Sequence, residues 1–99
     1  YKFAAGLFKH FNLEFDKTLT NLAGNQYGQQ VFKNQVKNVD INESYELIFP
    51  SQIENIATSF IQGFFYEFVE TFGLSGIEDR VEIKSSIKNL KRIIIDCLL

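Results

Sequence analysis

Between residues 58 and 72, large apolar side chains recur at the spacing of an α-helix. They form two adjacent rows of i, i+4 neighbours: Phe60, Ile61, Phe64, Phe65, Phe68, Val69 and Phe72. A stripe this wide must be buried against other structure. Each fully buried side chain contributes about 1.5 to 3 kcal/mol, so this helix would organise the core of a small protein. We predict that Thr58 or Ser59 caps the helix and that Gly73 ends it.

The length of the chain predicts one domain. Its 99 residues are 45% hydrophobic, which provides enough apolar surface for one core, so we expect a single domain over residues 1–99. The 11 Phe and 4 Tyr are expected mainly in that core. So many rings could also exceed what one small core holds, which would favour a homodimer surface. The chain begins at Tyr1 and not at a Met, which suggests a trimmed start or a piece of a longer protein.

Charge and cysteine content restrict the expected partners and the cellular compartment. The 10 Lys and Arg residues stand against 12 Asp and Glu residues, so no broad basic field favours nucleic acid or an anionic membrane as the main partner. The single Cys97 has no disulfide partner within the chain, the first residues do not resemble a signal peptide, and no apolar stretch reaches about 20 residues. We expect a cytoplasmic protein.

The other segments predict an α/β fold. Residues 11–16 alternate apolar and polar side chains as a strand does, and residues 1–8 fit either strand or helix. With the strand interpretation, residues 1–16 form an N-terminal hairpin. The pattern further predicts a helix over 27–39, a central strand over 45–49, a turn over 74–79, a strand over 80–84 and a last helix capped by Ser85 or Ser86. We expect a small mixed sheet with about three helices packed on it, with an α+β arrangement as the alternative.

Residue chemistry favours a protein without catalytic activity. His10 is the only histidine, which makes a poor metal site, and Cys97 lies on the inner stripe of the last predicted helix, where a thiol acts as a small hydrophobe. Neither a GxGxxG nor a GxxxxGK[ST] motif is present, so a phosphate-binding loop is not expected. We therefore predict no enzyme activity, no metal and no cofactor.

Thr58 and Ser59 are the residues most suited to regulation. Both precede the apolar helix, where free backbone N–H groups create a positive end that favours an anion. A phosphoryl group there would add about 1.5 to 2 negative charges. The alternative is that these hydroxyls serve only as an ordinary helix cap.

Residues 11–98 resemble the STAS-like family of bacterial and phage proteins (DUF4325). The family has a strand ending in Asp-Phe, a threonine-x-Ser-Phe helix start, a long apolar helix, a Gly-containing first helix and a final strand and helix. The corresponding segments here are Leu47-Ile48-Phe49, Ala57-Thr58-Ser59-Phe60, the helix to Phe72, Tyr27 to Phe32, Val81 to Ile83 and Ile87 to Leu98. Two departures stand out, because Ile48 replaces the family's Asp and the Asp-Ser-Ser-Gly of the related anti-sigma factor antagonists is absent.

The resemblance implies a role in protein recognition. In the antagonists, a kinase phosphorylates a serine at the start of the helix that follows the central strand, a role that would fall on Ser59 or Thr58. We expect a non-enzymatic, partner-switching regulatory module whose partner is a histidine-kinase-like ATPase or another regulator. The alternative is a phage or mobile-element protein that blocks a host factor by direct contact. The expected partner surface comprises Gln52, Glu54, Asn55 and Gln62.

Overall fold

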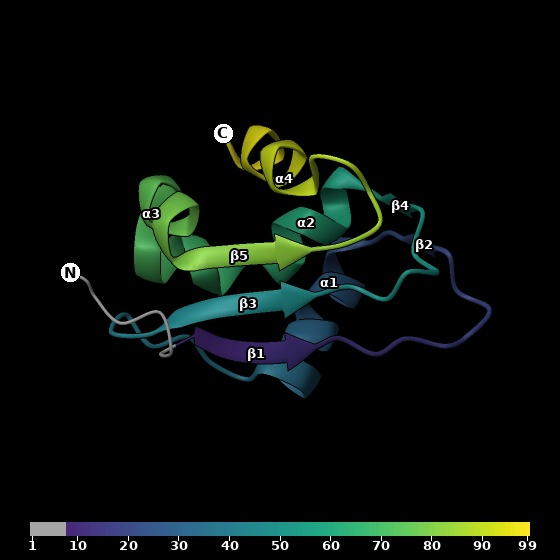
Figure 1. The fold of residues 1–99 in the computed structure, drawn as a ribbon, viewed down its shortest axis with the longest axis horizontal. Coiled ribbons are helices and arrows are strands. Elements are labelled where there is room, and N and C mark those ends of the chain that lie inside the picture. Colours follow the sequence, from purple (N-terminus) through teal and green to yellow (C-terminus); the bar gives the residue numbers. More distant parts are fainter. Residues whose placement is uncertain (1–7) are drawn as a thin grey trace.

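A three-stranded parallel sheet is the centre of the computed structural model, which describes residues 8–99 (Figure 1). Its strands run in the order β1-β3-β5, and a short parallel pair, β2 and β4, lies beyond their carboxyl ends. The bounds are β1 Phe8–Asn12, β2 Asn21–Leu22, α1 Asn25–Val31, η2 Phe32–Val36 (a π-helical turn), β3 Ser44–Ile48, β4 Asn55–Ile56, α2 Thr58–Phe64, α3 Tyr66–Arg80, β5 Val81–Lys84 and α4 Leu90–Leu98. The α/β prediction is confirmed. The prediction of a mixed sheet is wrong, since every strand pair within residues 8–99 is parallel.

The connecting helices cover one face of this sheet. Each crossover adds its strand on the same side of the last one, and right-handed crossovers of that kind place their helices on a common face. Figure 1 views the opposite face, with α1 and α2 behind the strands and α4 beside β5. Tyr45 and Leu47 point to the helices and are buried, whereas Glu46 and Lys84 lie on the other face with an ion pair between them.

Aromatic rings hold the helices on the sheet. Phe60, Phe64, Phe65 and Phe68 are all fully buried, and edge-to-face ring contacts join α3 to the sheet and to η2. The predicted apolar stripe of residues 58–72 is therefore the centre of the core, with Val69 and Phe72 at its margin.

The α1 and α2 helices cross at two glycines. A Cβ atom on Gly63 would lie 2.1 Å from the backbone oxygen of Asn25, and one on Gly28 would lie 2.5 Å from that of Phe60. Both separations are far below van der Waals contact, so only glycine allows the two backbones to approach this closely. This crossing fixes the position of everything that α1 and α2 carry.

Three predictions about the helices after the central strand are wrong. The apolar helix is broken at Phe65 (φ −91°, ψ 5°) into α2 and α3, and residues 74–79, expected as a turn, are helical. Gly73 does interrupt the helix, because its φ of 71° and ψ of 174° suit only glycine, but helical structure resumes and continues to Arg80. In α4 the residue before the helix is Asn89 in the left-handed conformation, so neither Ser85 nor Ser86 is its cap.

Earlier segments also differ in detail. The first strand is Phe8–Asn12 rather than residues 11–16, and the remainder of the proposed hairpin, residues 1–7, lies outside the described residues. The first helix begins at Asn25 and changes to a π-helical turn after Val31, so it ends at Val36 and not at residue 39. The predicted strands 45–49 and 80–84 correspond to β3 and β5, with β3 in the central position.

Candidate functional site

Thr58 and Ser59 are the first two residues of α2, and both are exposed. The extended residue that precedes the helix is Ala57 (φ −76°, ψ 153°), and no side chain caps this helix. The prediction that Thr58 or Ser59 is the N-cap is therefore wrong. Because both residues already have helical positions, their hydroxyls are free to contact other elements.

Ser59 connects the starts of two helices. Its Oγ accepts a hydrogen bond of 3.0 Å from the backbone N–H of Gly24, the residue that immediately precedes α1. This N–H has no partner inside its own helix, so the Ser59 hydroxyl satisfies a helix-end donor of a neighbouring element. A change at Ser59 would therefore act directly on the contact between α1 and α2.

Thr58 faces a different neighbour. Its Oγ1 lies 3.4 Å from Sγ of Cys97, which belongs to α4. The thiol is half-buried and packs at the edge of the core, as its predicted place on the inner stripe of the last helix requires. The two residues predicted as alternatives for one regulatory role thus contact different elements, Ser59 toward α1 and Thr58 toward α4.

The four residues predicted as a partner surface do not form one patch of free side chains. Gln52 uses its amide to bridge the backbone oxygens of Asp16 and Leu19, at 2.6 and 2.9 Å. Asn55 donates to the side chain of Asn21 across the β2–β4 pair. Glu54 and Gln62 are exposed, with Glu54 beside β4 and Gln62 within α2.

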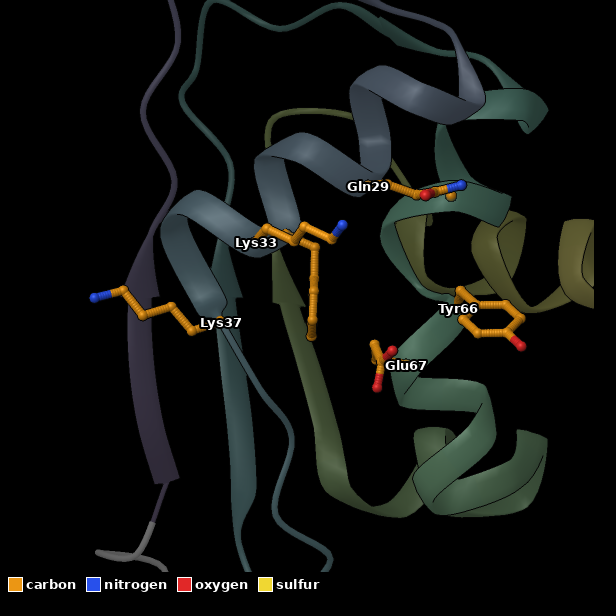
Figure 2. A pocket seen from close by; sticks show the side chains of 7 residues that line it. Gln29, Lys33, Lys37, Tyr66 and Glu67 are labelled. Carbon is orange, nitrogen blue, oxygen red and sulfur yellow. The ribbon is translucent and has the colours of Figure 1, made fainter.

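A groove of about 330 Å³ opens beyond the glycine crossing, where α1 and η2 separate from α2 and α3 (Figure 2). In Figure 2, Gln29 and Lys33 extend from the first wall toward the second, and Glu67 stands on the second wall. Lys37 is at the rim and its amino group points away, and the Tyr66 ring turns outward. The lining residues are Gln29, Phe32, Lys33, Lys37, Gly63, Tyr66 and Glu67.

Both walls of this groove depart from regular helix. The first wall contains the π-helical turn, closed by a 2.7 Å bond from the Lys37 N–H to the oxygen of Phe32, and Lys37 itself has a φ of 81°. The second wall contains the break at Phe65 between α2 and α3. π-Helical turns and non-glycine residues with positive φ cost free energy and are concentrated at functional sites.

The walls also differ in charge. Residues 17–39 include Lys17, Lys33 and Lys37 but no Asp or Glu, although the whole chain is acidic. Within residues 8–99, Lys33, Lys37 and Glu67 form no ion pair. The groove therefore has Lys33 on one wall and Glu67 on the opposite wall, while Lys37 lies at the rim with its amino group directed away.

The groove was not among the predicted sites. Two signals in the sequence point to it: Gly28 and Gly63 interrupt otherwise helical apolar patterns, and residues 17–39 lack acidic side chains. A glycine inside a helix often marks a close backbone approach. Which two helices meet at these glycines depends on the tertiary structure.

The open face of the sheet carries a row of polar side chains in contact with one another. His10 Nδ1 contacts one carboxylate oxygen of Glu46, and Lys84 Nζ lies 3.2 Å from the other. The pKa of Glu46 is lowered, chiefly by the hydrogen bond with His10 and further by Lys84, with partial burial acting in the opposite direction. No cluster of three or more His, Cys, Asp or Glu residues that could hold a metal ion occurs in the described part of the chain.

Comparisons with known proteins add nothing to this geometry. No family model, curated protein or solved structure matches the chain. Among residues 8–99, no helix has the length and apolar content needed to cross a membrane.

Proposed function

We propose that this chain is a non-enzymatic, protein-binding regulatory module of the STAS-like type that acts in the cytoplasm. The observation that carries the proposal is the exposed Ser59 at the start of the helix that follows the central strand, bonded to the first residue before α1. A regulatory serine needs access to a kinase and a structural contact that its modification changes, and Ser59 meets both requirements.

Phosphorylation of Ser59 would act through electrostatics and sterics. The phosphoryl group adds about 1.5 to 2 negative charges beside the Gly24 N–H and enlarges the side chain at the seam between α1 and α2. A partner that binds at this seam would lose contacts as a result. The partner we propose is a histidine-kinase-like ATPase or another regulatory protein.

Affinity capture from the native host tests this function with three variants. We expect the wild type and Ser59→Ala to recover the same partner, whereas Ser59→Glu should reduce its recovery at least about fivefold, since an introduced charge at a protein interface is costly. Ser75→Glu is the matched control, because Ser75 is an exposed serine within α3. Absence of a reproducible partner, or equal recovery with Ser59→Glu, would contradict the proposal.

Exposed apolar side chains support a second candidate, an inhibitor from a phage or mobile element that blocks a host factor by contact. Tyr66, Ile93 and Leu99 are 57%, 41% and 83% exposed, and Tyr66 and Leu99 line the same hollow between α3 and α4. Such side chains also suit a homodimer, which sedimentation would detect. A host enzyme or structural factor as the captured partner, insensitive to Ser59→Glu, would favour the inhibitor.

A further inference from the structure

The groove beyond the glycine crossing lies between two irregular backbone segments. Gly28 and Gly63 bring α1 and α2 into backbone contact, and beyond them the groove is lined by residues of the π-helical turn and of the start of α3, just after the break at Phe65. Two independent irregularities open onto the same space. Both irregularities cost free energy and both border this groove, which indicates that the groove has a function.

The floor and the first wall of the groove define what it can bind. Phe32 is 4% exposed and provides an apolar floor beside the backbone of Gly63. Gln29 and Lys33 line the same groove and extend from the first wall toward the second, and Lys37 lies at the rim with its amino group directed away. A ligand with both a carboxylate and an apolar side chain satisfies these features together.

We propose that this groove docks an acidic peptide segment of the partner protein, with a carboxylate toward Lys33, an apolar side chain on Phe32, and Lys37 contributing positive charge from the rim. The inference rests on the proposed protein-binding function and names the part of the partner that is recognised. Charge complementarity favours this occupant, because Lys33 extends into the groove with no ion pair within residues 8–99, and the wall that carries it belongs to the acid-free residues 17–39. Two lysines on an acidic chain make too small a basic surface for nucleic acid.

Glu67 allows a test in which the direction of the change in binding is predicted. It stands on the opposite wall, has no ion pair within residues 8–99, and would repel the carboxylates of an acidic segment. Removing its charge should strengthen binding, whereas reversing the charge of Lys33 should weaken it. For a basic ligand, the two variants would have the opposite effects on binding.

The probe is a phage-displayed library of random 12-residue peptides selected on the immobilised whole chain. We expect the enriched peptides to carry Asp or Glu next to an aliphatic or aromatic residue. The most enriched peptide, measured by fluorescence anisotropy at low salt, should bind Lys33→Glu with Lys37→Glu about tenfold more weakly and Glu67→Gln about twofold more tightly. Amide shifts in NMR should map to Gln29, Lys33, Gly63 and Glu67.

Lys88→Glu is the control, because Lys88 is exposed, lies outside the groove and undergoes the same charge change. The groove would be overturned as the docking site if Lys88→Glu weakened peptide binding equally, or if the NMR shifts mapped elsewhere. A basic consensus among the selected peptides, or no enrichment at all, would also overturn it. So would a dimer of this chain formed through the groove. The proposed function is tested separately by capture of the partner and its response to Ser59→Glu. A captured partner whose binding is unaffected by Lys33→Glu would retain the function and exclude this site.

Discussion

At the scale of single residues, two glycines determine how α1 meets α2. Side chains at Gly28 or Gly63 would collide with backbone oxygens, which cannot rotate away as a flexible side chain can. Ser59 lies on the same seam and bonds to Gly24. The seam between α1 and α2 is therefore closely packed at the two glycines, and its exposed Ser59 is accessible to modification.

Gly63→Ala should destabilise the protein by about 2 to 3 kcal/mol, because the new methyl group forces α1 and α2 apart. Urea unfolding followed by circular dichroism measures the change. Gln62→Ala is the control: this neighbouring side chain is exposed, so its removal should alter the free energy of unfolding by about 0.5 kcal/mol or less. Equal stability of Gly63→Ala and wild type would show that the helices do not cross this closely.

At the scale of elements, the sheet differs on its two faces. The helix side is apolar, while the other side carries a cross-strand row in which Glu46 of β3 contacts His10 of β1 and Lys84 of β5. Parallel sheets are usually covered on both faces, so a polar row is what allows one face to remain without helices. The contact of Glu46 with His10 and its ion pair with Lys84, both between neighbouring strands, also favour the observed register.

The ionised form of Glu46 should stabilise the fold above a pH of about 4.5, its ordinary pKa, because the pKa is lowered in the folded state. This contribution should be lost as the pH falls through the folded-state pKa, where the carboxylate becomes protonated. We therefore expect Glu46→Gln to be less stable than wild type near pH 7 but to approach it near pH 3.

Urea unfolding at these two pH values measures the effect, with Glu54→Gln as the control because Glu54 is exposed and forms no ion pair within residues 8–99. If the free energies of unfolding of Glu46→Gln and wild type differ by the same amount at both pH values, ionisation of Glu46 does not contribute to stability.

At the scale of the whole molecule, one ring joins the sheet to three of the helical segments. Phe64 is fully buried, and its ring centroid lies between 5.0 and 6.4 Å from those of five other rings. These belong to η2, the end of β3, α2, the α2–α3 junction and α3: Phe32, Phe49, Phe60, Phe65 and Phe68. Loss of this ring would remove contacts on every side at once.

Phe64→Ala should cost about 3 to 5 kcal/mol, a large part of the roughly 5 to 15 kcal/mol that stabilises a domain of this size. Thermal unfolding should show a much lower midpoint or no cooperative transition. Tyr66→Ala is the control two residues away, because Tyr66 is 57% exposed and its removal should have little effect on stability. A small loss with Phe64→Ala would place the centre of the core elsewhere.

The sequence by itself determined the strands around Tyr45 and Val81, the buried stripe from Phe60 to Phe68 and the α/β class. These follow from local periodicity, which reports how each segment is buried. Only the tertiary structure decided the break at Phe65, the π-helical turn after Val31, the role of Ala57 as N-cap and the groove. The groove lies where α1 and η2 face α2 and α3, and the contacts between these segments join residues as far apart as Gly24 and Ser59, 35 positions along the chain. Local patterns carry no information about such contacts.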